Sequence, residues 1–146
     1  MSNLKNIFDD KTKAELVKVI KSAELNTSGE IRLHVENKCK IDVLDQAAFI
    51  FKKLKMHKTE LRNGVLVYLA ITDKKFAIIG DAGINAKVTD NFWDDIKNQM
   101  SDCFKEGDFV KGLSIGIEMT GEQLKKHFPY QKDDVNELPD EISIGN

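Results

Sequence analysis

The sequence predicts an α/β fold, a three-layer α/β/α sandwich built on a small mixed sheet of about four strands. Two observations predict it. Helical and strand periodicities alternate along the chain, and one strand candidate is apolar on both faces. A strand of that kind needs cover on both sides, which helices provide. We expect one domain over residues 1–146, with residues 129–146 forming an acidic C-terminal segment packed on it.

The first predicted elements are a helix and a half-polar strand. Thr12 followed by Glu15 is typical of a capping box, and the apolar stripe behind it predicts a helix over residues 12–23. Residues 30–36 then alternate between apolar and polar side chains, which predicts a strand. Arg32 and His34 fall on the polar face.

A second helix and two strands follow. Asp42 is a helix cap before an apolar stripe. Residues 64–71, GVLVYLAI, predict the central strand, joined to the first by a right-handed crossover. Residues 76–79 predict its hairpin partner, and residues 80–83, which contain two glycines, predict a loop.

Two helices complete the predicted fold. Asp90 and Asp108 are each placed to open one. Gly112 and Gly116 lie one turn apart in the second helix, where glycine costs helix stability. We therefore expect them to mark a close approach of that helix to the sheet.

The charge balance excludes some functions. The 22 basic and 24 acidic residues give a net charge of −2, which argues against binding nucleic acid. The apolar run at residues 65–71 is too short to span a bilayer, and the first ten residues show no signal peptide. We therefore expect a cytoplasmic monomer without a membrane anchor.

Common catalytic signatures are absent. There is no Walker-type loop and no dinucleotide fingerprint. Residues 112–116 have the spacing of a nucleophile elbow, but they lie inside a predicted helix. The three histidines are far apart in the sequence, so structural roles are the simpler interpretation.

The C-terminal segment suggests a metal site. Residues 133–141 read DDVNELPDE, with five carboxylates in nine residues. Apolar residues between the acids would anchor the segment, and a hard cation would relieve the repulsion between fixed carboxylates. We expect Ca²⁺ first, with Mg²⁺ or Zn²⁺ as alternatives and room for more than one ion. The predicted ligands in this segment are Asp133, Asp134, Asn136, Glu137 and Asp140.

One loop rarely fills such a coordination shell alone. Asp81 lies between glycines and could turn toward an ion. If residues 64–71 and 76–79 form a hairpin, Asp81 and Glu30 lie at the same sheet edge and complete the predicted ligand set. Arg62 and Asn63 precede the central strand at that edge, where they could hold a phosphate group.

These stretches resemble the TPM domain family. The resemblance covers about residues 14–128 and rests on TSGEI at 27–31, RNGVL at 62–66, IGDAGI at 79–84 and GDF at 107–109. The ending NELPDEI is similar to that of short bacterial members without other domains. The resemblance implies an α/β/α sandwich, binding of calcium or another divalent ion, and the acid phosphatase activity of plant lumenal members.

Three functions follow as hypotheses. The first is a divalent metal-binding, stand-alone TPM domain with a regulatory role and ion-ordered loops. The second is a metal-assisted phosphatase acting on phosphomonoesters, with Arg62 or Lys58 holding the phosphate. The third is a protein-interaction module with an unidentified protein partner.

Overall fold

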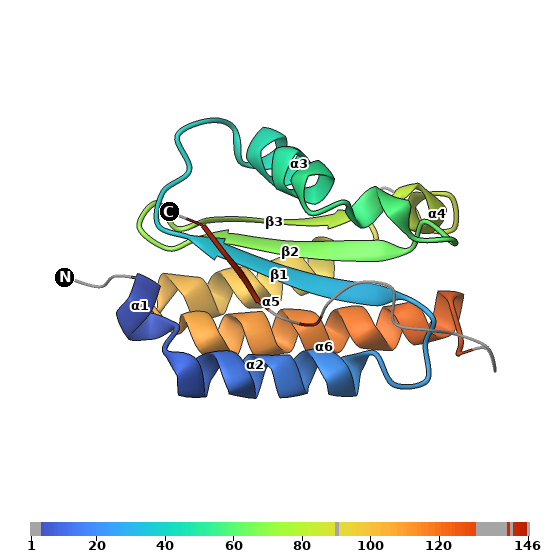
Figure 1. Ribbon diagram of the computed structural model, residues 1–146, viewed down its shortest axis with the longest axis horizontal. Helices are drawn as coiled ribbons and strands as arrows, with labels where there is room; N and C mark the ends of the chain where they lie inside the picture. The colour runs from blue at the N-terminus through green and yellow to red at the C-terminus, as the bar shows by residue number, and fades with distance from the viewer. Residues whose placement is uncertain (1–3, 90, 131–139, 141, 146) are drawn as a thin grey trace.

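The computed structural model describes residues 4–89, 91–130, 140 and 142–145. It confirms the predicted α/β/α sandwich with a mixed sheet of four strands. Helix α3 covers one face of the sheet, and helices α2, α5 and α6 cover the other (Figure 1). The helices are α1 (Leu4–Ile7), α2 (Asp10–Ala23), α3 (Val43–Lys53), the 3-10 helix η1 (Met56–Lys58), α4 (Ala82–Asn85), α5 (Asp94–Lys105) and α6 (Phe109–His127).

The sheet has the strand order β3-β2-β1-β4. Strand β1 pairs in parallel with β2 and also with β4, whereas β2 and β3 form an antiparallel hairpin. The strands are β1 (Glu30–Glu36), β2 (Gly64–Ala70), β3 (Lys75–Gly80) and β4 (Ser143–Ile144). Because β1, β2 and β4 run in the same direction, their carboxyl ends meet at one edge of the sheet, at the left in Figure 1.

The central strands separate two apolar layers. Odd-numbered residues of β1 and β2, such as Leu33 and Val67, pack toward α2, α5 and α6. Even-numbered residues of β2, such as Tyr68, pack toward α3. Every residue of β2 is buried, as the apolar pattern of residues 64–71 predicts.

Helix boundaries follow their caps. The side chains of Asp42 and Asp108 accept hydrogen bonds from the first backbone N–H groups of α3 and α6, as predicted. Helix α5 begins at Asp94 instead of at the predicted Asp90, which lies outside the described residues. A turn occupies the residues just before α5, so the helix starts about one turn later than its apolar pattern suggests.

The two glycines of α6 mark a close approach, but to a helix and not to the predicted sheet. A side chain at Gly112 would meet Phe104, and one at Gly116 would meet Met100, both on α5. Gly121 approaches the backbone of Ala23 in α2 in the same way. These contacts let α6 pack closely between its two neighbours in the lower layer of Figure 1. No helix among the described residues is long and apolar enough to cross a membrane.

Candidate functional site

An acidic pocket lies at the amino edge of the parallel strands. Glu24 follows the last residue of α2 and caps its end, and Glu30 opens β1. Asp140, from the C-terminal segment, lines the same pocket, which has a volume of about 250 Å³. The pocket therefore brings together carboxyl groups from three parts of the chain.

Backbone contacts bring the C-terminal segment to this pocket. The amide of Ser28 donates to the carbonyl of Phe128 at 2.8 Å, and the amide of Tyr130 donates to the carbonyl of Asn26 at 3.0 Å. Thr27 forms an isolated bridge with Pro129. The turn between α2 and β1 is thus tied to the residues that follow α6, and Asp140 returns to the same turn.

The pKa of Glu24 is strongly raised in this pocket. Burial raises the pKa of Glu24 to about 9, with a further contribution from its hydrogen bond to Asp140. The negative charges of Asp140 and Glu30 act in the same direction, while a hydrogen bond from the Ile31 amide, 2.9 Å from Oε2, partly opposes them. Glu24 therefore keeps its proton near neutral pH, because burial beside other acidic groups disfavours its charged form.

Asp81 is held in place instead of turning freely. Its carboxylate accepts two hydrogen bonds from Arg62, at 2.8 Å from Nε and 2.9 Å from the terminal nitrogen. It also accepts from the Ala82 amide and caps α4, which replaces the loop predicted over residues 80–83. The side chain is only 5% exposed, whereas that of Arg62 is 48% exposed.

The Asp81→Ala variant is expected to lose about 1–2 kcal/mol of unfolding free energy. It removes a helix cap and an ion pair whose acidic member is buried. Chemical denaturation of the metal-free protein measures the loss. The Arg62→Ala variant should also lose stability, because it leaves the buried Asp81 carboxylate without its positively charged partner. An Arg62→Ala variant as stable as the wild-type protein would contradict this account.

The structure brings together only part of the predicted site. Glu30 and Asp140 line one pocket, while Asp81 and Arg62 pair with each other nearby. Asn63 is buried and donates to the carbonyl of Ser28 at 3.2 Å, so both predicted phosphate-binding residues have partners within the chain. The remaining predicted ligands, Asp133, Asp134, Asn136 and Glu137, lie outside the described residues.

No group of three or more acidic, histidine or cysteine side chains within the described residues is arranged to hold a metal ion. The acidic pocket thus holds Glu24 in its protonated form, with Glu30 and Asp140 lining the same pocket. Sequence reasoning missed Glu24. Its signal is weak, since an acid just after a helix end looks like an ordinary surface residue.

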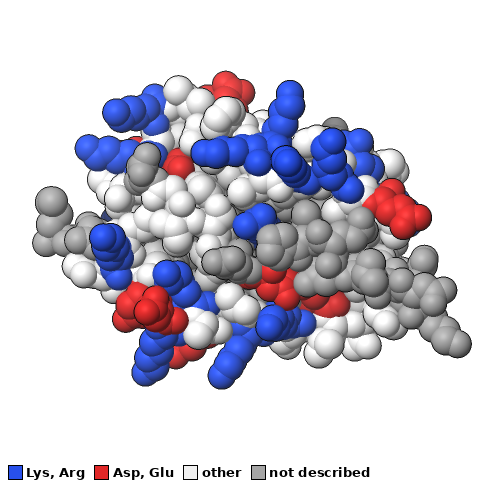
Figure 2. Space-filling view, viewed as in Figure 1, with Lys and Arg blue, Asp and Glu red and all other residues white. Residues whose placement is uncertain are grey.

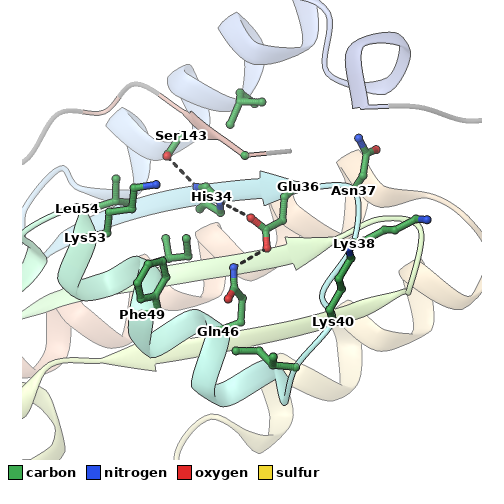
Figure 3. A pocket seen from close by; sticks show the side chains of 14 residues that line it. His34, Glu36, Asn37, Lys38, Lys40, Gln46, Phe49, Lys53, Leu54 and Ser143 are labelled. Atoms are coloured by element: carbon green, nitrogen blue, oxygen red, sulfur yellow. Dashed lines mark hydrogen bonds and ion pairs between the residues drawn. The ribbon is translucent and has the colours of Figure 1, made fainter.

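A second polar cluster lies at the opposite edge of the sheet (Figure 3). His34 Nε2 lies 3.0 Å from Glu36 Oε1, and His34 Nδ1 lies 2.8 Å from Ser143 Oγ. The other oxygen of Glu36 accepts hydrogen bonds from Gln46, at 2.9 Å, and from the Tyr68 hydroxyl. We call these five residues the carboxyl-edge network.

His34, on the polar face of β1, is buried. The residue is only 5% exposed, and its ring stacks on that of Tyr68 with the centroids 5.9 Å apart. Burial lowers the pKa of His34, against a hydrogen bond to Glu36 that raises it. The polar face of β1 is turned toward the α3 layer, and hydrogen bonds within the network satisfy it.

Comparison with known proteins gives a family and a common fold. The family model of the TPM domain matches residues 1–123. Among solved structures, the BA42 protein from the psychrophilic bacterium Bizionia argentinensis is 48% identical, with a TM-score of 0.91 over 99% of this chain and 100% of that chain. No curated protein sequence matches.

Two more distant structures share the fold. The N-terminal domain of a P. gingivalis protein is 13% identical, with a TM-score of 0.69 over 88% of this chain and 86% of that chain. The N-terminal domain of the cg2496 protein from Corynebacterium glutamicum is 12% identical, with a TM-score of 0.65 over 84% of this chain and 77% of that chain.

Proposed function

The chain belongs to the TPM domain family, and we propose that it binds a divalent cation in the acidic pocket formed by Glu24, Glu30 and Asp140. Ca²⁺ is the first candidate and Mg²⁺ the second. In this proposal the ion acts on conformation. It fastens the C-terminal segment to the turn between α2 and β1, which gives the domain a regulatory role.

The observation that carries the proposal is the burial of Glu24 in one pocket with two further acidic residues. A pKa of about 9 for Glu24 means that the pocket disfavours the negative charge of this group, although Lys21 also lines the pocket. A divalent cation would stabilise the ionised carboxyl group of Glu24 and release its proton. Glu30 would add a third carboxylate beside the pair.

The chemistry of the lining residues favours a hard ion. The potential donors among the described residues are carboxylates, the Ser28 and Thr27 hydroxyls, the Asn26 amide and backbone carbonyls. Ca²⁺ and Mg²⁺ prefer such oxygen ligands, whereas Zn²⁺ usually takes histidine or cysteine. No histidine or cysteine lines the described part of this pocket. We therefore place Zn²⁺ behind the other two ions.

The other predicted ligands remain predictions. Asp133, Asp134, Asn136 and Glu137 precede Asp140 in the chain and could add oxygen donors or a second ion. Asp81 could join only if its carboxylate left Arg62. In the present proposal Asp81 supports the fold of the nearby edge, so Asp81→Ala should still bind the ion.

Calorimetric titration of chelator-treated protein with Ca²⁺, Mg²⁺ and Zn²⁺ tests the function. We expect Ca²⁺ to bind more tightly than about 1 mM, within the range of protein calcium sites. The double variant Glu24→Gln/Asp140→Asn should lose this binding. The control Glu15→Gln/Asp102→Asn makes the same two substitutions at exposed positions on α2 and α5 and should keep this binding. Failure of all three ions to bind the wild-type protein would refute the proposal.

The two alternatives from the sequence remain predictions. Metal-assisted phosphatase activity would need Arg62 to exchange Asp81 for a phosphate group. A protein-interaction role would need a partner that the sequence does not identify. No contact within the described residues favours either alternative over cation binding, and the expected cytoplasmic location and monomeric state also remain predictions.

A further inference from the structure

We propose that the cleft at the carboxyl edge of the sheet binds a small organic anion with an apolar body. The cleft has a volume of about 880 Å³, within the usual range for small-molecule sites. It lies at the edge opposite the acidic pocket, so this inference does not depend on cation binding. His34, Glu36 and Ser143 form its floor, and α3 and the segment after β1 form its walls.

The topology places the cleft beyond the carboxyl end of a central parallel strand. Strand β1 lies between β2 and β4, and from its carboxyl end the chain crosses through α3, on one face of the sheet, to reach β2. In open α/β sheets, ligands commonly bind outside the carboxyl ends of the parallel strands.

The charge at the rim selects for an anion. Lys38 and Lys40 extend from the segment after β1, and Lys53 extends from the end of α3 (Figure 3). All three are exposed, and none forms an ion pair with a carboxylate of the described residues. Lys and Arg side chains also gather over the α3 side of the molecule in Figure 2. These ammonium groups can attract and hold a negatively charged head group.

The acid inside the cleft does not cancel this attraction. Glu36 is buried and accepts hydrogen bonds from Gln46 and Tyr68, with His34 Nε2 against its second oxygen. A carboxylate only accepts hydrogen bonds, so His34 carries its proton on Nε2. Its Nδ1 then accepts the Ser143 hydroxyl proton, so the polar side chains at the floor of the cleft are held by one another.

Exposed apolar side chains in the cleft would contact the apolar body of the ligand. Phe49 is 59% exposed, Ile41 52% and Ile144 44%, which is unusual for large hydrophobic residues. All three line the cleft, together with the lysines. A ligand with an apolar body would cover these side chains while its anionic group met the ammonium groups. The combination distinguishes this cleft from an ordinary basic surface.

An NMR titration of the ¹⁵N-labelled protein with 2-naphthoate tests the inference. We expect amide shifts at residues 34–41, at 46–54 and at 143–145. The neutral analogue 2-naphthalenemethanol should bind at least about tenfold more weakly, since it lacks the charge that the lysines recognise. A parallel titration with 2-naphthyl phosphate shows whether a carboxylate or a phosphate head group is preferred.

Matched variants separate the cleft from general surface charge. Lys38→Gln/Lys40→Gln/Lys53→Gln should weaken naphthoate binding about tenfold or more. The control Lys18→Gln/Lys111→Gln/Lys126→Gln makes the same change in net charge at exposed positions elsewhere and should leave binding within about twofold. Equal weakening in both variants, equal binding of the neutral analogue, or shifts confined to other surfaces would overturn the inference.

Discussion

The Glu24→Gln variant is expected to be more stable than the wild-type protein in metal-free buffer at pH 8, by about 1–3 kcal/mol. Burial raises the pKa of Glu24 from 4.5 to about 9, so the folded protein keeps a proton that the unfolded chain has released. The stability contributed by this group is therefore fully present below pH 4.5 and is lost as the pH rises toward 9. Glutamine remains neutral and avoids that loss. Thermal unfolding of both proteins from pH 4 to pH 9 measures this difference in stability.

Addition of Ca²⁺ should raise the melting temperature of the Glu24→Gln variant less than that of the wild-type protein. Saturating Ca²⁺ stabilises whichever state binds it, so the melting temperature of the wild-type protein should rise. Glu24→Gln should show a much smaller rise, because it lacks the carboxyl group that would release its proton and bind the ion. Glu15→Gln, at an exposed position of α2, is the matched control and should behave like the wild type. If the melting temperature of Glu24→Gln fell with rising pH as steeply as that of the wild-type protein, the raised pKa would not belong to Glu24.

The Glu36→Ala variant is expected to lose about 3 kcal/mol or more of unfolding free energy. The substitution leaves the Tyr68 hydroxyl, the Gln46 amide and His34 without their shared acceptor. Each buried donor without a partner costs about 1–3 kcal/mol. Burial also raises the pKa of Tyr68, so its hydroxyl keeps its proton and still needs an acceptor. Urea denaturation measures the loss. The dependence of the unfolding free energy on urea concentration should be the same as in the wild-type protein.

Two controls distinguish the network from a general loss of charge. Glu36→Gln keeps one oxygen acceptor in place and should lose less than Glu36→Ala. Glu106→Ala removes a carboxylate from an exposed position after α5 and should change stability by less than about 0.5 kcal/mol. If Glu36→Ala proved as stable as Glu106→Ala, the network would not hold the edge of the sheet together.

The regular part of the fold could be predicted from local patterns. The alternation in residues 30–36 matches β1 residue for residue, and Asp42 and Asp108 cap the helices that they were expected to open. Strand β4 could not be predicted, because two residues carry no usable periodicity and the pairing with β1 is long-range. Helix α4 was missed for a related reason: one turn capped by Asp81 looks like a glycine-containing loop.

The candidate sites were only partly predictable. Glu30 and Asp140 were selected for their charge, and the structure places both at one pocket. Glu24 was missed because its importance arises from burial against a distant segment, which no local pattern encodes. The burial of His34 was not predicted, because alternation identifies two faces of a strand but not whether a helix covers the polar one.

Calcium titration of the chelator-treated protein at pH 7.5, in two buffers of different ionisation enthalpy, tests the exchange of a proton for a cation most directly. The difference between the two observed enthalpies gives the number of protons released on binding. The account predicts release of about one proton per Ca²⁺ from the wild-type protein, because Glu24 holds a proton at this pH. Calcium binding without proton release would contradict it.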